Sequence, residues 1–344
     1  MSIDPILKPR IEQIPPVSPA ALDIFNQSLV WDAILPWARG SNADHIDIIL
    51  PRYQRVGVDF VSLTVGLQPG IEETMRHIAS VRRAIADRNT WVVLAQTTQE
   101  VQNARAAGKL AVGLNFQDPG PLQNSLDMIA VYRALGVRQI GLAYNTRNLL
   151  ADGGAEDEDA RLSRLGIAAV RAMNRAGILV DGSHAGRNST LHAMEIGDRP
   201  FIFSHSNPFS IRPHYRSVTD DQIKACAATG GVVGINGVGF WVGDLDAPTE
   251  AIFRCLDYTV ETIGPRHVGL GFDYIYDLQH LMGVLRGMPD VWPAYRGEQM
   301  VLHNYAGPEQ MVELVQMMLD HGYAREHIEM ILGGNWNRVY ALCE

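Results

Sequence analysis

Eight short apolar runs recur along this 344-residue chain, and the segments between them show the hydrophobic spacing of helices. The runs are apolar nearly throughout instead of alternating with polar residues, which is typical of parallel strands covered on both faces. They cover residues 29–35, 60–66, 110–117, 139–145, 178–184, 201–206, 231–237 and 267–273, and a further run at 91–97 is interpreted as an accessory strand.

The intervening helical patterns end on glycine. Apolar residues at 165, 168, 169, 172 and 173 precede Gly177, and those at 311, 314, 315, 318 and 319 precede Gly322. This alternation predicts an α/β fold, a (β/α)8 TIM-type barrel in one domain spanning residues 1–344, with residues 1–27 as an N-terminal extension packing on the barrel. An open doubly wound sheet is disfavoured because no Gly-rich phosphate turn follows the first run.

Two of the predicted strands lead directly into a histidine, His184 in the fifth run and His205 in the sixth. Side chains at the carboxyl ends of parallel strands face the ligand crevice of an α/β protein, and imidazole is a preferred zinc ligand. The pair therefore indicates a metal site. The alternative is that one or both are buried histidines hydrogen-bonded to neighbouring residues.

Other polar residues end strands at the same predicted rim. A carboxylate suited to proton transfer and a guanidinium suited to holding a substrate carboxylate complete a plausible hydrolytic site. The candidates are Asp32, Gln117, Asp118, Tyr144, Asn145, Arg216 and Asp273. Each has a plainer interpretation: Asp273 as a helix N-cap, Arg216 as a surface charge, Tyr144 as a core residue.

Composition excludes several classes of partner. The net charge is −9 and there is no block of Lys or Arg, so a nucleic-acid partner is not expected. No run of about 18 apolar residues predicts a membrane span, and residues 1–20 lack the apolar core of a signal peptide. Three cysteines without C-x-x-C spacing are typical of thiols in a reducing compartment, which predicts a cytoplasmic protein.

Six short motifs, in this order, resemble the renal (membrane) dipeptidase family, peptidase M19, whose members are metallopeptidases on amidohydrolase-like barrels. They span most of the chain, and together they are far more specific than any one alone. The motifs are Leu142-Ala143-Tyr144-Asn145, Asp181-Gly182-Ser183-His184, Ser204-His205-Ser206, Arg216-Ser217-Val218-Thr219-Asp220, Gly269-Leu270-Gly271-Phe272-Asp273 and Gly333-Gly334-Asn335-Trp336.

The resemblance implies hydrolysis of short peptides at a binuclear zinc site, by members that often dimerise. It implies that His184 and His205 bind one zinc, that Arg216 grips the substrate carboxylate and that Asp273 handles the proton of the attacking water. Tyr144 stands where many members place a substrate-contacting histidine, so that contact is altered here.

The departures from the family pattern concern the other zinc. The His-x-Asp pair expected at the end of the first strand is absent, with Ile34 and Pro36 in its place, or Asp32 and Ile34 under a shifted pairing. The bridging glutamate of the third barrel strand is replaced by Gln117, next to Asp118. Two adjacent divalent cations repel unless anionic ligands lie between them.

We therefore expect at most one zinc ion, on His184 and His205, with a third ligand from Asp32, Asp118 or Asp273, and a metal-free site is the alternative. The leading hypothesis is a dipeptidase-like amide hydrolase for a small carboxylate-bearing substrate, a dipeptide or a modified amino acid. The alternatives are a non-hydrolytic or metal-free enzyme on an amino-acid derivative and a non-catalytic small-ligand-binding barrel.

Overall fold

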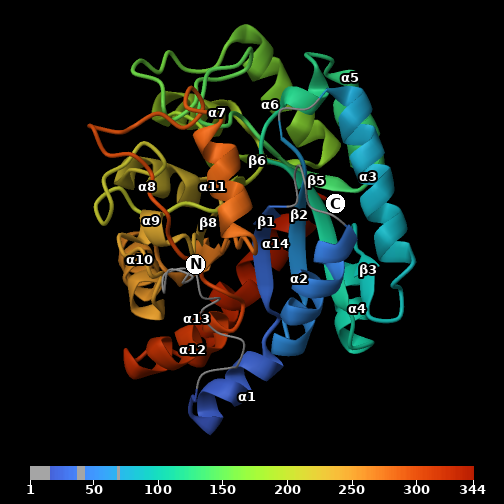
Figure 1. Ribbon diagram of the computed structural model, residues 1–344, viewed down its shortest axis with the longest axis vertical. Coiled ribbons are helices and arrows are strands. Elements are labelled where there is room, and N and C mark those ends of the chain that lie inside the picture. Colours follow the sequence, from blue (N-terminus) through green and yellow to red (C-terminus); the bar gives the residue numbers. More distant parts are fainter. Residues whose placement is uncertain (1–15, 37–42, 68–69) are drawn as a thin grey trace.

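Eight parallel strands form a nearly closed barrel in the computed structural model, which describes residues 16–36, 43–67 and 70–344 (Figure 1). The strand order is β1-β2-β4-β5-β6-β7-β8-β9, with β3 paired only to β4. Apart from β3, neighbours in the barrel therefore follow one another in sequence, unlike the reversed order of a doubly wound sheet. The predicted (β/α)8 barrel and its accessory strand are confirmed.

Most strands are shorter than the apolar runs that predicted them, whereas β2 has the same bounds as its run. Their bounds are β1 Trp31–Pro36, β2 Phe60–Gly66, β3 Val92–Leu94, β4 Leu110–Phe116, β5 Val137–Gly141, β6 Leu179–Asp181, β7 Phe201–Phe203, β8 Val232–Ile235 and β9 Val268–Leu270. The predicted runs continued to His184 and Ser206. The chain leaves the ladder earlier because the Asp181 carboxylate accepts the Ser183 N–H and His184 has a φ of 71°, outside the extended region.

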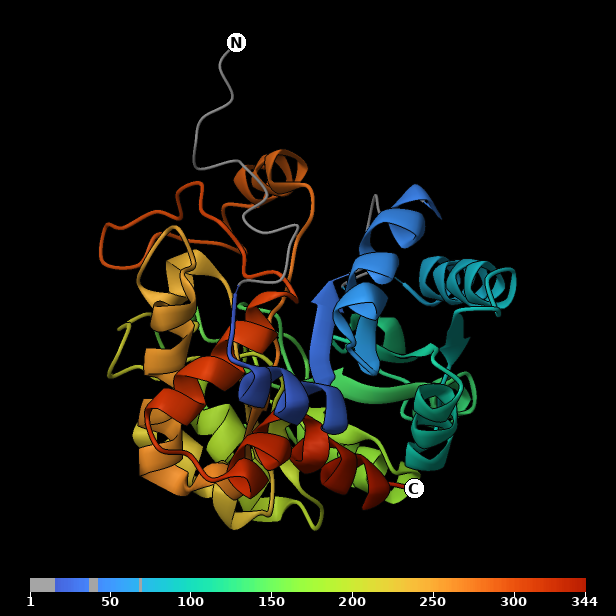
Figure 2. The same ribbon diagram turned by 90° about the horizontal axis from the view of Figure 1, so that it is seen from below.

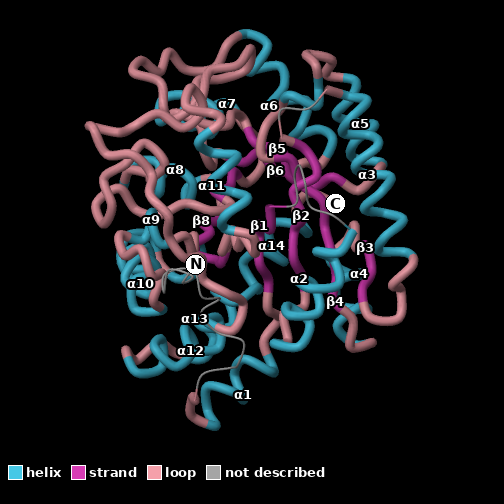
Figure 3. The backbone as a smooth tube through the Cα atoms, viewed as in Figure 1, coloured by secondary structure: helices cyan, strands magenta, loops and turns pink. Residues whose placement is uncertain are grey.

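Helices surround the strands, as Figures 2 and 3 show. Gly177 and Gly322, which were predicted to end helices, follow α6 and α12 with φ values of 68° and 79°, a conformation that favours glycine. The helices are α1 Pro19–Gln27, α2 Ala43–Val56, α3 Ile71–Ala86, α4 Thr98–Ala106, α5 Asp127–Ala134, α6 Arg164–Ala176, α7 Arg187–Ile196, α8 Asp220–Ala228, α9 Gly239–Val242, α10 Thr249–Ile263, α11 Leu278–Arg286, α12 Gln310–Asp320, α13 Arg325–Glu329 and α14 Asn335–Ala341.

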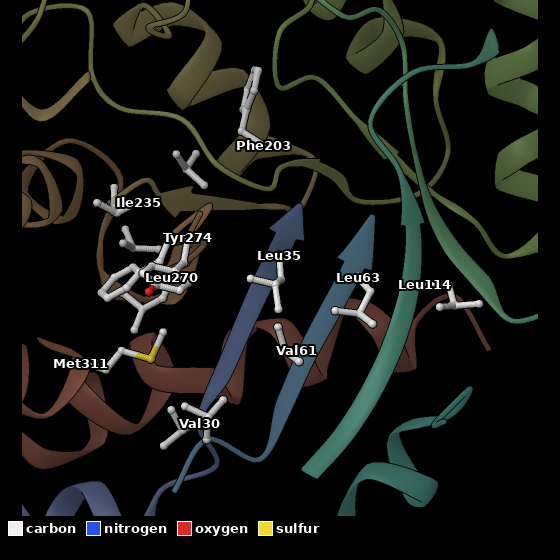
Figure 4. Close-up of a cluster of buried hydrophobic side chains, with 14 of the residues drawn as sticks. Val30, Leu35, Val61, Leu63, Leu114, Phe203, Ile235, Leu270, Tyr274 and Met311 are labelled. Atoms are coloured by element: carbon white, nitrogen blue, oxygen red, sulfur yellow. The ribbon is translucent and has the colours of Figure 1, made fainter. Parts of the chain in front are cut away.

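The apolar core fills the space around the strands and under the helices, where Figure 4 shows side chains from β1, β2, β4 and α12. Trp336 of α14 is fully buried and donates from its indole to the Leu270 carbonyl at 3.1 Å. A Cβ atom on Gly269 would lie 2.3 Å from the Trp336 indole nitrogen, so this glycine is needed for the approach. The Gly333–Trp336 motif is therefore structural.

Side chains join the first and last strands where the ladder stops. Asp32 on β1 accepts the Phe272 N–H at 3.0 Å and the Tyr53 hydroxyl at 3.1 Å. Arg52 on α2 forms a bidentate pair with Glu309, at 2.6 and 2.8 Å. Polar side chains thus hold β1 and α2 to the segment after β9.

The N-terminal extension is described from residue 16, and residues 1–15 lie outside the described part of the chain. Helix α1 lies against α12, with the Ser18 N–H donating to Gln316 at 2.8 Å and Arg325 paired with Asp23 at 2.9 Å. None of the helices in the described ranges is both long and apolar enough to cross a membrane.

Candidate metal and substrate site

Two histidine rings face each other at the carboxyl ends of β6 and β7. His184 Nε2 and His205 Nε2 lie 3.0 Å apart, and both side chains are buried. Two ligands about 2.0–2.1 Å from one zinc ion would have nearly this separation. The predicted pair is thus brought together in a geometry that one ion can span.

The other nitrogen of His184 is fixed as a donor. His184 Nδ1 lies 2.7 Å from Asn145 Oδ1, and an amide oxygen can only accept a hydrogen bond. Nδ1 therefore carries the hydrogen, and Nε2 presents its lone pair to His205. The Asn145 amide nitrogen is buried without a partner among the described residues, so it remains a candidate substrate donor as predicted.

The other nitrogen of His205 is fixed through Ser204, which it contacts at 2.6 Å. Ser204 Oγ donates to Asp181, whose oxygens also accept the Ser183 and Ser204 N–H groups and Gln139 Nε2. An ionised carboxylate can only accept hydrogen bonds, so the hydroxyl hydrogen of Ser204 points to Asp181. Ser204 Oγ then accepts from His205 Nδ1, so Nε2 of His205 is also unprotonated.

The two Nε2 atoms therefore turn lone pairs toward each other. Burial lowers the pKa of both histidines well below the usual value, and the charge of Arg216 lowers both further. A metal cation would satisfy both lone pairs at once, and ligating histidines usually donate their second nitrogen in this way. Buried histidines hydrogen-bonded to their neighbours stay the alternative, with one Nε2 atom donating to the other across the 3.0 Å contact.

Arg216 lies beside the pair and is only 4% exposed, so its interpretation as a surface charge is wrong. Its Nη2 atom donates to the His205 carbonyl at 3.3 Å, and its Nε atom is buried without a partner among the described residues. Burial lowers the pKa of this guanidinium, while the nearby Asp273 charge raises it. A buried cation with an unused donor can bind an anionic group of a ligand.

Asp273 follows β9 with a φ of 58°, a left-handed conformation uncommon for aspartate. Its interpretation as a helix N-cap is wrong because α11 begins only at Leu278. Asn236 donates to it at 3.3 Å. Burial raises the pKa of Asp273 to about 7, although the positive charge of Arg216 lowers this pKa in part. Such a carboxyl group can exchange a proton near neutral pH.

Tyr144 stacks on His184, with ring centroids 4.1 Å apart. Burial raises the pKa of the Tyr144 hydroxyl most, and the charge of Asp273 raises it further. Tyr144 is therefore a member of the site and not a remote core residue.

The remaining candidates have other partners. Asp32 is fully buried in the β1–β9 contact, Gln117 donates to Thr64 at 3.0 Å, and Asp118 accepts the Gly120 N–H at 2.7 Å. In the ranges that the structure describes, no three His, Cys, Asp or Glu side chains form a group that could hold a metal ion. The third ligand expected from the sequence stays a prediction.

Several residues at the site were not identified from the sequence. Ser204 and Asp181 flank the histidines in the quoted motifs, and that adjacency was their only signal. Trp292, whose ring centroid lies 5.8 Å from that of His184, and Asn236, the partner of Asp273, belong to segments with no motif.

Comparison with known proteins gives a consistent picture. The family model described as membrane dipeptidase (peptidase family M19) matches residues 26–291. Dipeptidase tcpJ of Claviceps purpurea (strain 20.1) is 26% identical over 314 residues, covering 86% of this chain and 69% of that protein. An amidohydrolase structure from Pseudomonas aeruginosa aligns with a TM-score of 0.84 at 22% identity, covering 94% of this chain and 98% of that chain.

A second solved structure has the same fold. It is a metallo peptidase from Rhodobacter sphaeroides liganded with a phosphinate mimic of the dipeptide L-Ala-D-Ala, with a TM-score of 0.75 at 18% identity, covering 92% of this chain and 99% of that chain.

Proposed function

Because the chain belongs to the membrane dipeptidase family, peptidase family M19, we propose that it hydrolyses the amide bond of a small substrate with a free carboxylate. The substrate class is a dipeptide or a modified amino acid. Hydrolysis breaks the amide C–N bond, forms a C–O bond with the oxygen of water and delivers a proton to the leaving amine. The relative named dipeptidase tcpJ supports this reaction class.

One observation carries the proposal: the unprotonated Nε2 atoms of His184 and His205 face each other at 3.0 Å. These residues would supply two of the ligands that one zinc ion needs, with the third expected from Asp32, Asp118 or Asp273. When bound, zinc would supply Lewis-acid polarisation of a carbonyl oxygen and a lower pKa for a bound water. Asn145 and Ser204 hold the two rings in the required tautomers.

The charged residues provide the remaining functions. Arg216, with its unused Nε donor, binds the substrate carboxylate and sets the direction in which the substrate lies. Asp273, whose pKa is raised to about 7 by burial, takes a proton from water and returns it to the leaving amine. Its left-handed backbone is the kind of local strain that accumulates at functional positions.

A two-ion centre does not fit these residues. Ile34 is fully buried and offers no ligand atom, and Gln117 is neutral and already donates to Thr64. Without carboxylates between them, two divalent cations would repel strongly. We propose at most one ion per chain.

Elemental analysis of protein purified without added metal or chelator tests the proposal, combined with turnover of a dipeptide panel. We expect at most one equivalent of zinc and hydrolysis that is lost in His184→Ala. Two equivalents would contradict the single-ion site. Absence of both metal and turnover would favour the metal-free or non-catalytic alternatives.

Two further proposals concern the whole protein. A cytoplasmic location is supported by Cys226, Cys255 and Cys343, which are free and buried. A homodimer is proposed from the family resemblance alone, and size measurement in solution would test it.

A further inference from the structure

Aromatic side chains collect on one side of the histidine pair, and the proposed reaction does not use most of them. We define the aromatic wall as Tyr144, Trp241, Trp292 and Tyr305. Trp292 meets Tyr144 and His184 edge-on, with centroid distances of 5.6 and 5.8 Å. Trp241 is parallel to Trp292 within 17°, at 6.3 Å, and Tyr305 packs on the cluster that contains Trp241.

The wall is a supported surface with rings left partly uncovered. Trp241 is only 5% exposed, whereas Tyr144, Trp292 and Tyr305 are half-buried. Rings held by other rings lose little conformational freedom on binding, and their uncovered faces and edges favour stacked or edge-on contact with another ring.

Charged groups lie near the same rings. The charges of Asp273 and Arg216 both act on the hydroxyl groups of Tyr144 and Tyr305, whose pKa values are raised mainly by burial. A substrate bound here would therefore have a polar end at Arg216 and an apolar side against the wall. Tyr144 and Trp292 both contact the ring of His184, beside which the hydrolysed carbonyl would lie, so the substrate residue that supplies this carbonyl places its side chain nearest the wall.

We propose that this N-terminal residue of the substrate carries an aromatic or large apolar side chain, which packs on the aromatic wall. The inference rests on the proposed amide hydrolysis and adds the substrate class. Filling such a surface discriminates by size and shape, and a difference of one methylene group is typically worth a factor of about 10–200 in kcat/KM.

A matched series of dipeptides tests the inference. The substrates share one C-terminal residue and begin with Ala, Leu, Phe or Trp. We expect kcat/KM for the Phe and Trp members to exceed that for the Ala member by roughly tenfold or more. In Trp292→Ala this ratio falls toward one. Trp91→Ala, a partly buried tryptophan before β3, serves as the matched control and keeps the ratio.

The outcomes separate this inference from the proposed function. Equal turnover of the Ala and Phe members, or an unchanged ratio in Trp292→Ala, overturns the inference and leaves amide hydrolysis in place. Absence of turnover on every substrate overturns amide hydrolysis. The wall is then tested by calorimetric binding of phosphinate dipeptide analogues with Ala or Phe in the first position, where equal affinities overturn it.

Discussion

Arg52 Nη1 donates to the hydroxyl of Tyr274 at 2.6 Å, one residue after Asp273. The same guanidinium holds Glu309 with its other nitrogens, and the neighbouring Tyr53 contacts Asp32, which in turn accepts the Phe272 N–H. Consecutive residues of α2 therefore hold the segment on both sides of Asp273. This explains how a non-glycine residue keeps a φ of 58° there.

Tyr274→Phe removes only the hydroxyl, so it should displace Asp273 without creating a cavity in the core. We expect kcat to fall by roughly tenfold or more with little change in KM, because small misplacements of catalytic groups are costly. Tyr323→Phe, which loses a 2.7 Å hydroxyl–Asp257 bond, is the matched control. A fall in Tm alone, with kcat preserved, would assign Tyr274 a purely structural role.

Arg216→Ala should weaken substrate binding by about 2–5 kcal/mol, seen as a higher KM, if it pairs with a buried carboxylate. It should also move the acid limb of the kcat/KM profile to higher pH, because Arg216 lowers the pKa of Asp273. Arg216→Lys keeps the charge but loses the planar donor pair, so it should restore the pH profile better than KM. An unchanged KM in Arg216→Ala would remove the proposed role.

Ser204→Ala leaves the His205 Nδ1 hydrogen without its acceptor, so the His205 ring is no longer held in one tautomer. We expect zinc affinity, measured by competition with a chelator, to fall by about 10–100-fold. Ser28→Ala removes a buried serine hydroxyl at the end of α1 and should leave the affinity unchanged. Equal affinities in all three proteins would show that Ser204 does not orient a ligand.

Restoring the missing ligands with Ile34→His, Pro36→Asp and Gln117→Glu together should raise the metal content above that of the wild type. The physical reason is that carboxylates would then lie where a second cation needs them. Elemental analysis provides the measurement, with Gln117→Glu alone for comparison. No rise in the triple variant would mean that the assignment of these positions, on β1 and just after β4, is wrong.

Asp59 gives a prediction for stability. Burial raises its pKa to about 6 in the folded protein, above the usual 3.8, despite hydrogen bonding to Val30 and the charge of Arg105. The folded state thus binds the proton of Asp59 more tightly than the unfolded state does. The protonated Asp59 side chain therefore adds to the free energy of unfolding at low pH, and this stabilisation is lost as pH rises from about 4 through 6. In Asp59→Asn, the fall in the free energy of unfolding between pH 4 and 6 should be smaller by up to about 3 kcal/mol.

Urea unfolding at several pH values between 4 and 6.5 measures this difference. Asp87→Asn changes an exposed aspartate just after α3 and should follow the wild-type curve. Parallel curves for Asp59→Asn and wild type would show that Asp59 does not titrate differently in the two states.

The barrel could be predicted because its strands are buried on both faces and therefore read as uninterrupted apolar runs. The loop conformations could not be predicted from the sequence, because they depend on contacts between residues that lie far apart in it. Asn145 meets His184 across 39 residues, and Trp292 reaches the same ring from a segment without periodic pattern. The histidine pair was found because each follows an apolar run that predicts a strand. Ser204 and Asp181 orient the pair through contacts that spacing does not encode.

The bond between the Asp32 carboxylate and the Phe272 N–H joins residues 240 positions apart. Ribosomal synthesis would complete Phe272, Asp273 and Tyr274 long after β1 and α2 have emerged, so the candidate proton-transfer residue can reach its place only late. Contacts this distant in sequence also slow folding, because a long loop must close first. Catalytic competence should therefore lag behind the appearance of secondary structure during refolding.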